Sequence, residues 1–130
     1  MLALIVDDSR TMRVILRRTL RGLGYEAIEA ENGAEALALL ESGVTPDVCL
    51  VDWYMPVLDG LGFIHAVKQR PDWRHLVLMM VTSEAETSAI VRALAAGAHE
   101  YLVKPFTTDA IADKLQILGL PTHRPDEVPA

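Results

Sequence analysis

The sequence predicts an α/β fold in which a sheet of parallel strands carries helices on both faces. Five short apolar runs alternate with stretches of helical periodicity, and successive runs begin about 23 to 28 residues apart. That interval is the length of one strand and its crossover helix, and strict strand–helix alternation is typical of a parallel sheet. The 130 residues suit one compact domain, so no second domain is expected.

The five apolar runs are the predicted strands. Four of them are rich in Val, Ile or Leu with little alternation, which is typical of strands buried on both faces. The second run alternates more and carries Glu26 and Glu29, so it is expected at an edge of the sheet. The runs are Leu2–Val6, Tyr25–Ala30, Val48–Val51, Leu76–Val81 and Tyr101–Val103.

The segments between the strands are the predicted helices. In the first helix, the apolar residues are spaced to form one face: Met12, Ile15, Leu16, Leu20 and Leu23. The arginines fall mostly on the other, solvated side: Arg13, Arg17, Arg18 and Arg21. Gly24 marks its end, and Asp59 is a candidate cap for the third helix. The predicted helices are Arg10–Leu23, Gly33–Glu41, Asp59–Lys68, Glu84–Ala96 and Asp109–Leu118.

Composition excludes several function classes. The formal net charge of −6 argues against a nucleic-acid partner. The longest apolar runs have about five residues, against roughly 20 for a membrane span, and the first run ends at once in two aspartates, unlike a signal peptide. The single cysteine, Cys49, allows no internal disulfide, and we expect an inert core thiol. These features predict a cytoplasmic protein. The stretch 119–130 holds three prolines and is predicted to be a disordered tail.

Reactive residues follow the ends of four of the strands. Asp7 and Asp8 follow the first strand, Asp52 the third, Thr82 the fourth and Lys104 the fifth. The carboxyl ends of parallel strands share one edge of the sheet, where ligands bind in open α/β folds. Like charges about 4 Å apart repel by roughly 4 kcal/mol at an effective dielectric near 20, and a divalent cation would relieve this.

The oxygen-only ligand set favours Mg²⁺, with Mn²⁺ or Ca²⁺ as alternatives, and argues against zinc. A carboxylate beside a metal ion, an ammonium group and a hydroxyl is suited to phosphoryl transfer through an acyl phosphate.

Five motifs occur in a characteristic order: Val6-Asp7-Asp8, Val51-Asp52-Trp53-Tyr54-Met55-Pro56, Asp59-Gly60, Val81-Thr82-Ser83-Glu84 and Tyr101-Leu102-Val103-Lys104-Pro105-Phe106. Together they resemble the receiver domain of two-component response regulators, and most nearly the stand-alone chemotaxis regulators. The resemblance covers about residues 2–118. It implies a flavodoxin-like (βα)5 fold with strand order 2-1-3-4-5, a receiver domain over 1–118 and the tail over 119–130.

The resemblance implies a role for each matching residue. Asp52 would be the phosphoacceptor, Lys104 the phosphate-binding lysine and Thr82 the switch hydroxyl. Tyr101 would be the aromatic side chain that changes rotamer on activation, and the bond between Lys104 and Pro105 would be cis.

The resemblance also implies a metal site and a partner-binding face. Asp7 and Asp8 would hold Mg²⁺, directly or through water, with Asp52 and the main-chain carbonyl of Tyr54. The partner-binding face would lie on helix four, strand five and helix five, and would include Ile90 and Val103. The side chains of Tyr54 and Glu84 would lie near the path of the attacking water and set the phosphate lifetime.

The expected function is therefore Mg²⁺-dependent phosphoryl transfer from a histidine kinase or phosphotransfer protein to Asp52, which switches binding to a target protein. Chemotaxis-type control or a phosphorelay would be the setting. The chain would be a signalling protein that catalyses its own phosphorylation and dephosphorylation, monomeric or dimerising on activation, with no nucleic acid or membrane partner.

Three alternatives stay open at this point. A pseudo-receiver would bind partners without phosphorylation, although the acid set is intact. An aspartyl-phosphate phosphatase of the haloacid-dehalogenase type would need a second acid two residues after its nucleophile on the first strand, whereas Asp7 and Asp8 are adjacent. A flavodoxin-like electron carrier would cradle a phosphate in its first loop, where these two carboxylates would repel it.

Overall fold

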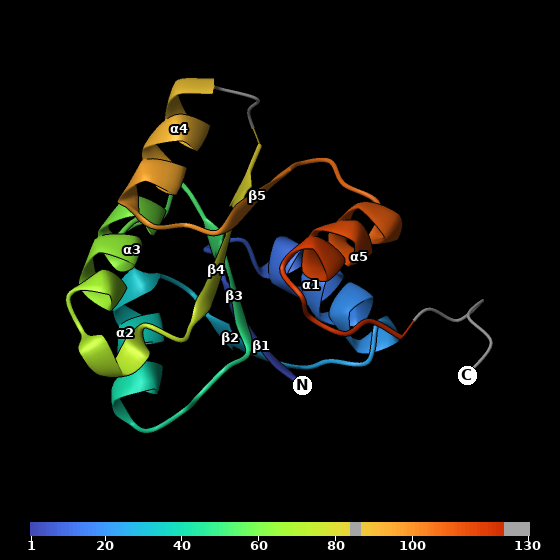
Figure 1. Cartoon of the computed structure of the whole chain (residues 1–130), viewed down its shortest axis with the longest axis horizontal. Helices are drawn as coiled ribbons and strands as arrows, with labels where there is room; N and C mark the ends of the chain where they lie inside the picture. Colours follow the sequence, from blue (N-terminus) through green and yellow to red (C-terminus); the bar gives the residue numbers. More distant parts are fainter. Residues whose placement is uncertain (84–86, 124–130) are drawn as a thin grey trace.

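Five parallel strands form one sheet in the computed structural model, which describes residues 1–83 and 87–123. The strand order is β2-β1-β3-β4-β5, with helices on both faces of the sheet (Figure 1). The fold class and strand order predicted from the sequence are therefore confirmed. The elements are β1 (Leu2–Val6), α1 (Arg10–Gly22), β2 (Glu26–Ala30), α2 (Gly33–Glu41), β3 (Val48–Asp52), α3 (Gly60–Lys68), the short 3-10 helix η1 (Pro71–Trp73), β4 (Val77–Thr82), α4 (Thr87–Ala96), β5 (Glu100–Val103) and α5 (Thr108–Ile117).

Two strands end on a polar residue that the apolar runs did not include. Asp52 pairs with Val81 at the end of β3, and Thr82 pairs with Val103 at the end of β4. Backbone pairing, not apolar character, defines where a strand stops. Both polar residues therefore stand on backbone that is fixed by the sheet.

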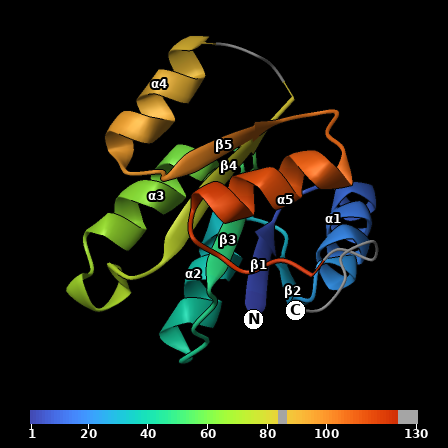
Figure 2. The same cartoon turned by 45° about the vertical axis from the view of Figure 1, so that its right-hand side comes forward.

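The sheet separates two apolar cores. Helices α2, α3 and α4 cover one face, and α1 and α5 cover the other, as Figures 1 and 2 show. Alternate residues of each central strand serve the two sides: Leu4 and Cys49 belong to the first core, and Ile5 and Leu50 to the second. Cys49 is fully buried, and burial raises the pKa of its thiol to about 12, in line with the inert thiol predicted.

The prediction for the faces of the first helix is partly wrong. Leu16 and Leu20 are buried as expected, but Ile15 is 43% exposed and Arg13 is buried. The reason is that Arg13 lies on the side of α1 that faces β2, where its guanidinium forms an ion pair with Glu29. Helical periodicity alone cannot show which flank of a helix meets a charged partner on another element.

Residues 119–123, the first part of the predicted tail, pack against the turn between α1 and β2. The Tyr25 hydroxyl donates a hydrogen bond to the carbonyl of Pro121 (2.8 Å), and the amide of His123 donates to the carbonyl of Leu23 (2.8 Å). Leu120 is half-buried against the second core. The rest of the predicted tail, 124–130, lies outside the described residues, as does the start of the predicted fourth helix at 84–86. Within the described ranges, no helix has both the length and the apolar composition needed to cross a bilayer.

Candidate metal and phosphoacceptor site

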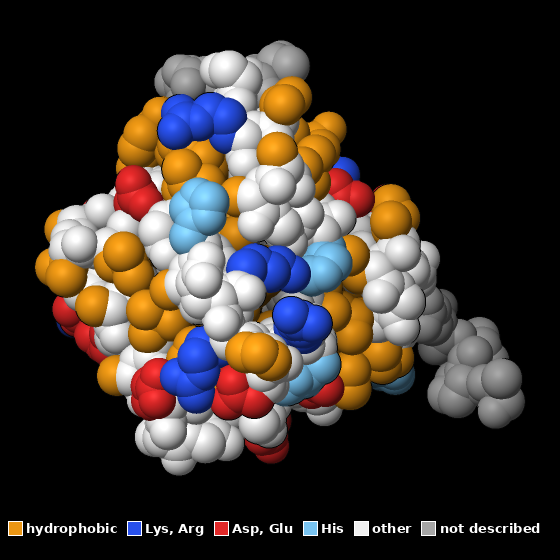
Figure 3. Space-filling model, turned by 60° about the vertical axis from the view of Figure 1, so that its left-hand side comes forward, with side chains coloured by type: hydrophobic (Ala, Val, Ile, Leu, Met, Phe, Trp, Pro, Cys, Tyr) orange, Lys and Arg blue, Asp and Glu red, His pale blue; other side chains and the backbone are white. Residues whose placement is uncertain are grey.

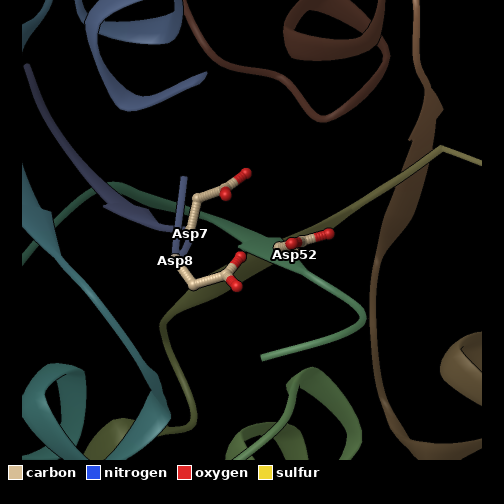
Figure 4. A group of neighbouring side chains, drawn as sticks. All are labelled: Asp7, Asp8 and Asp52. Atoms are coloured by element: carbon tan, nitrogen blue, oxygen red, sulfur yellow. The ribbon is translucent and has the colours of Figure 1, made fainter. Parts of the chain in front are cut away.

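Three carboxylates meet at the carboxyl edge of the central strands. Asp7 and Asp8 follow β1, and Asp52 ends the neighbouring strand β3. One carboxylate oxygen from each lies within 4.8 Å of the others. Figure 4 shows the three side chains extending from the two strand ends into a shared space. The parallel pairing of β1 with β3 places them there, as predicted from the sequence.

Asp7 is held by hydrogen bonds at its amide, its carbonyl and both carboxylate oxygens. Its amide donates to the carbonyl of Ala30 (3.1 Å), and its own carbonyl accepts from the guanidinium of Arg13 (2.8 Å). One carboxylate oxygen accepts from the amide of Ser9 (2.8 Å), and the other accepts from the ammonium of Lys104 (3.1 Å). Because the residue is 1% exposed, its position is fixed by these contacts before any ligand arrives.

The Lys104 ammonium forms ion pairs with carboxylates at the ends of β1 and β3. Its ammonium lies 3.1 Å from a carboxylate oxygen of Asp7 and 3.6 Å from one of Asp52. Its amide donates to the carbonyl of Thr82 (2.7 Å), which ties the end of β5 to the end of β4. The peptide bond from Lys104 to Pro105 is cis, as the resemblance implied. One cation therefore faces three carboxylates within this group.

The pKa of Asp52 is raised from 3.8 to about 6. Burial is the largest cause, and the negative charge of Asp7 adds to it, whereas the ammonium of Lys104 opposes it. A carboxylate destabilised in this way favours any step that places positive charge or a covalent bond on its oxygens.

The oxygen ligands and their burial fit a hard divalent cation. One carboxylate is buried, one is half-buried and one, that of Asp8, is exposed. The exposed side opens to a shallow groove lined by Asp8, Tyr54, Met55, Pro56 and Asp59. Mg²⁺ is bound by one or a few carboxylates and keeps several waters, so a partly open site of this kind suits it. Mn²⁺ has similar ligand preferences.

Comparison with known proteins decides the family. A model of the response regulator receiver domain matches residues 3–116. The chain belongs to this family. Chemotaxis protein CheY1 of Helicobacter pylori is 39% identical over 116 residues, covering 88% of this chain and 94% of that protein. Chemotaxis protein CheY of Pseudomonas aeruginosa is 41% identical over 114 residues, with 87% and 91% covered.

Solved structures agree with the sequence matches. The structure of Vibrio cholerae chemotaxis protein CheY4 has a TM-score of 0.82 and 34% identity, covering 89% of this chain and 96% of that one. A putative response regulator from Chloroflexus aurantiacus reaches 0.84 with 35% identity, covering 91% and 97%. The chain is thus a CheY-like receiver of two-component signalling, which confirms the resemblance stated from its motifs.

The side chains expected to form the switch of this receiver lie together behind the acidic site. Thr82, Ile90 and Tyr101 line one small apolar pocket with Trp53 and Met80. Thr82 is 5% exposed, and the other two switch residues are half-buried. Side chains from the end of β4, from α4 and from β5 therefore line the same pocket.

Other predicted residues of the receiver stand apart from that pocket. Val103 is half-buried beside Thr82 in the β4–β5 register. The Tyr54 side chain is 58% exposed at the rim of the groove. Glu84 lies outside the described residues. The ammonium of Lys114 on α5 lies 4.3 Å from the centre of the ring of Tyr101 on β5.

The interpretation of the sequence missed two supporting residues of the receiver. Arg13 bonds the carbonyl of Asp7, but its helical position assigned it to solvent. Gly60 begins α3 where a side chain would meet the Asp52 carbonyl at 2.4 Å, and its amide donates to the carbonyl of Trp53. The Asp59-Gly60 pair indicated the start of this helix, and Asp59 does cap it. The pair gave no sign that Gly60 lies so close to β3.

Proposed function

We propose that this receiver accepts a phosphoryl group on a carboxylate oxygen of Asp52 from the phosphohistidine of a histidine kinase or phosphotransfer protein. The observation that carries the proposal is the placement of Asp52 beside Asp7, Asp8 and Lys104 at one sheet edge. In the transfer, an oxygen–phosphorus bond forms on Asp52 and the phosphorus–nitrogen bond of the donor breaks. The imidazole of the donor takes up a proton from solvent as this bond breaks and leaves as a neutral ring.

Each neighbouring residue has a proposed part in that transfer. Lys104, held 3.6 Å from Asp52, would bind a phosphoryl oxygen, and the Thr82 hydroxyl would donate a hydrogen bond to another. Asp7, Asp8, Asp52 and the main-chain carbonyl of Tyr54 would hold Mg²⁺, or Mn²⁺ in its place. When bound, the metal ion supplies positive charge that stabilises the phosphoryl oxygens in the transition state.

Phosphorylation would then change the surface around the apolar pocket. Engagement of Thr82 by the phosphoryl group would let Tyr101 move inward and bias an existing equilibrium between two conformations. The output would be binding of a target protein at α4, β5 and α5, with Ile90 and Val103 at that face. Val91 and Leu94 of α4 are exposed. Figure 3 views a different side, formed by α2, α3 and α4, and shows hydrophobic atoms interleaved with Lys and Arg side chains there.

The test is the mass of the intact protein after incubation with acetyl phosphate, with and without Mg²⁺, alongside Asp52→Asn. We expect a gain of one phosphoryl group that requires Mg²⁺ and is absent in the variant. Absence of any gain with acetyl phosphate, together with no Mg²⁺-dependent change in Trp53 fluorescence on adding a beryllium fluoride phosphoryl mimic, would contradict the proposal. That pair of results would favour a phosphorylation-independent adaptor.

A further inference from the structure

Arg13 of α1 is a buried charged residue that contacts the main chain of the acidic site. It is 9% exposed, and its guanidinium links α1 to the end of β1 and the end of β2. One terminal nitrogen donates to the main-chain carbonyl of Asp7 (2.8 Å), and the Nε atom lies 3.3 Å from a carboxylate oxygen of Glu29 on β2. The second terminal nitrogen lies 3.9 Å from Glu31. A buried guanidinium is costly unless it is paired. Here one nitrogen is hydrogen-bonded and the other two lie beside carboxylates.

We propose that Arg13 is a positioning residue for the metal site: it fixes the backbone between Asp7 and Asp8 so that their carboxylates face Asp52. The carbonyl that it bonds belongs to the peptide unit linking the two aspartates. Rotation of that peptide would swing Asp8, the exposed member of the group, away from the other two. Glu29 orients the guanidinium from the far side. The inference rests on the metal site of the proposed function.

The sign of the effect separates positioning from plain electrostatics. A positive charge close to a cation site repels the cation, so removal of Arg13 through charge alone would tighten Mg²⁺ binding. Loss of a group that orients metal ligands instead weakens binding, commonly by 10- to 100-fold for partners of the ligands themselves. Because Arg13 acts through one main-chain carbonyl, we expect a weakening of about tenfold in Arg13→Met.

Arg17 is the matched control on the same helix. It also forms an ion pair with Glu29 (2.7 Å), and its other described bond runs to the carbonyl of Ala27. Arg17→Met therefore removes an arginine and a Glu29 contact while keeping the bond to Asp7. We expect its Mg²⁺ affinity to stay within twofold of the parent, even where its thermal stability falls.

The experiment is a Mg²⁺ titration of the full chain, followed by tryptophan fluorescence, with thermal unfolding of each variant measured without Mg²⁺. The chain has two tryptophans, so a Trp73→Phe background makes Trp53, next to Asp52, the reporter. Weaker binding in Arg13→Met but not in Arg17→Met supports the inference. Unchanged or tighter binding in Arg13→Met, or equal weakening in both variants, overturns it.

If Arg13→Met does not fold, Arg13→Lys replaces it, since lysine keeps the charge but lacks the planar fork that reaches both Asp7 and Glu29. An affinity lowered about threefold or more supports the inference in that variant, and a parent-like affinity overturns it. If the parent itself shows no Mg²⁺-dependent change, the metal site of the proposed function fails and the inference fails with it. A binding parent with a parent-like Arg13→Met removes the inference alone.

Discussion

At the scale of single residues, Asp52 lowers the stability of the metal-free fold while serving the site. Its folded-state pKa of about 6 lies above the usual 3.8, so ionisation costs the folded state more than the unfolded one. The folded state bears no such cost below about pH 4, where the carboxyl is protonated. The cost grows as the pH rises and is complete above about pH 6. The site therefore keeps a strained carboxylate at neutral pH that a cation or a phosphoryl group would relieve.

Asp52→Asn is predicted to stabilise the metal-free protein at pH 7.5 but not at pH 4. A shift of this size corresponds to about 2–3 kcal/mol, because one pKa unit is worth about 1.4 kcal/mol. Chemical denaturation at both pH values, without Mg²⁺, gives the difference between variant and parent. Glu26→Gln, at an exposed carboxylate of β2, is the control and should show little change. The same difference at pH 4 and pH 7.5 would contradict the prediction.

Tyr54 is predicted to prolong the life of the phosphorylated state. Its ring stands at the rim of the groove that leads to Asp8, where water would approach the acyl phosphate. We expect Tyr54→Asn to speed decay by about two- to tenfold, since less water is excluded from the reacting phosphorus. Tyr54→Phe keeps the ring and should decay like the parent. The rate is measured by intact mass after removal of the phosphodonor, and equal rates in all three proteins would remove the idea.

At the scale of elements, the start of α3 is fitted against the end of β3. A methyl group at Gly60 would lie 2.4 Å from the carbonyl oxygen of Asp52 and 2.7 Å from the end of Met80. The backbone carbonyl cannot move without disturbing the strand. Gly60→Ala is therefore predicted to cost at least about 2 kcal/mol in unfolding free energy and to weaken Mg²⁺ binding by displacing Asp52.

Gly22 supplies the contrasting substitution for that prediction. It is the exposed last residue of α1, and a methyl group there would meet nothing within 4 Å. Gly22→Ala should stabilise the protein by about 0.5–1 kcal/mol, because alanine loses less backbone entropy on folding. Urea denaturation of both variants checks the pair. A Gly60→Ala protein as stable as the parent would show that the two elements are not closely fitted.

At the scale of the whole molecule, most of the fold could be predicted because buried parallel strands leave unbroken apolar runs. The runs at Leu2–Val6 and Val48–Val51 identified the two central strands, and the acids after them identified the edge that carries the site. What escaped prediction depends on contacts between distant elements. The burial of Arg13 requires Glu29 of β2, and the end of β3 at Asp52 requires its pairing with Val81.

The arrangement of the site residues could be predicted only in part. Sequence spacing could place Asp7 and Asp52 at one edge, because strand pairing fixes that relation. It could not show that four polar atoms of Asp7 are already bonded, or that Lys104 contacts both carboxylates, since these depend on side-chain conformations. It also could not show the packing of Tyr101 with Thr82 in one pocket.

The segment after α5 packs against the turn between α1 and β2, at the end of the sheet away from the three carboxylates. Tyr25, at the entrance to β2, bonds the carbonyl of Pro121, 96 residues along the chain. His123 bonds the carbonyl of Leu23, and Leu120 packs on the core beneath α1 and α5. A proline-containing stretch is typical of a disordered end, but the Leu23 carbonyl just after α1 and the Tyr25 hydroxyl give these residues hydrogen-bonding partners.

A chain that ends at Leu118 is predicted to be less stable than one that ends at His123 by about 1–3 kcal/mol, since it loses two hydrogen bonds and the partial burial of Leu120. Tyr25→Phe in the longer chain should account for about 1 kcal/mol of that difference. Both shortened chains should bind Mg²⁺ equally, because the carboxyl edge of the sheet lies at the opposite end of the strands. Urea denaturation and Mg²⁺ titration measure the two effects separately. Equal stability of the two chains would show that residues 119–123 add nothing to the fold, as the boundary at Leu118 predicted. Unequal Mg²⁺ binding would show that these residues affect the acidic site.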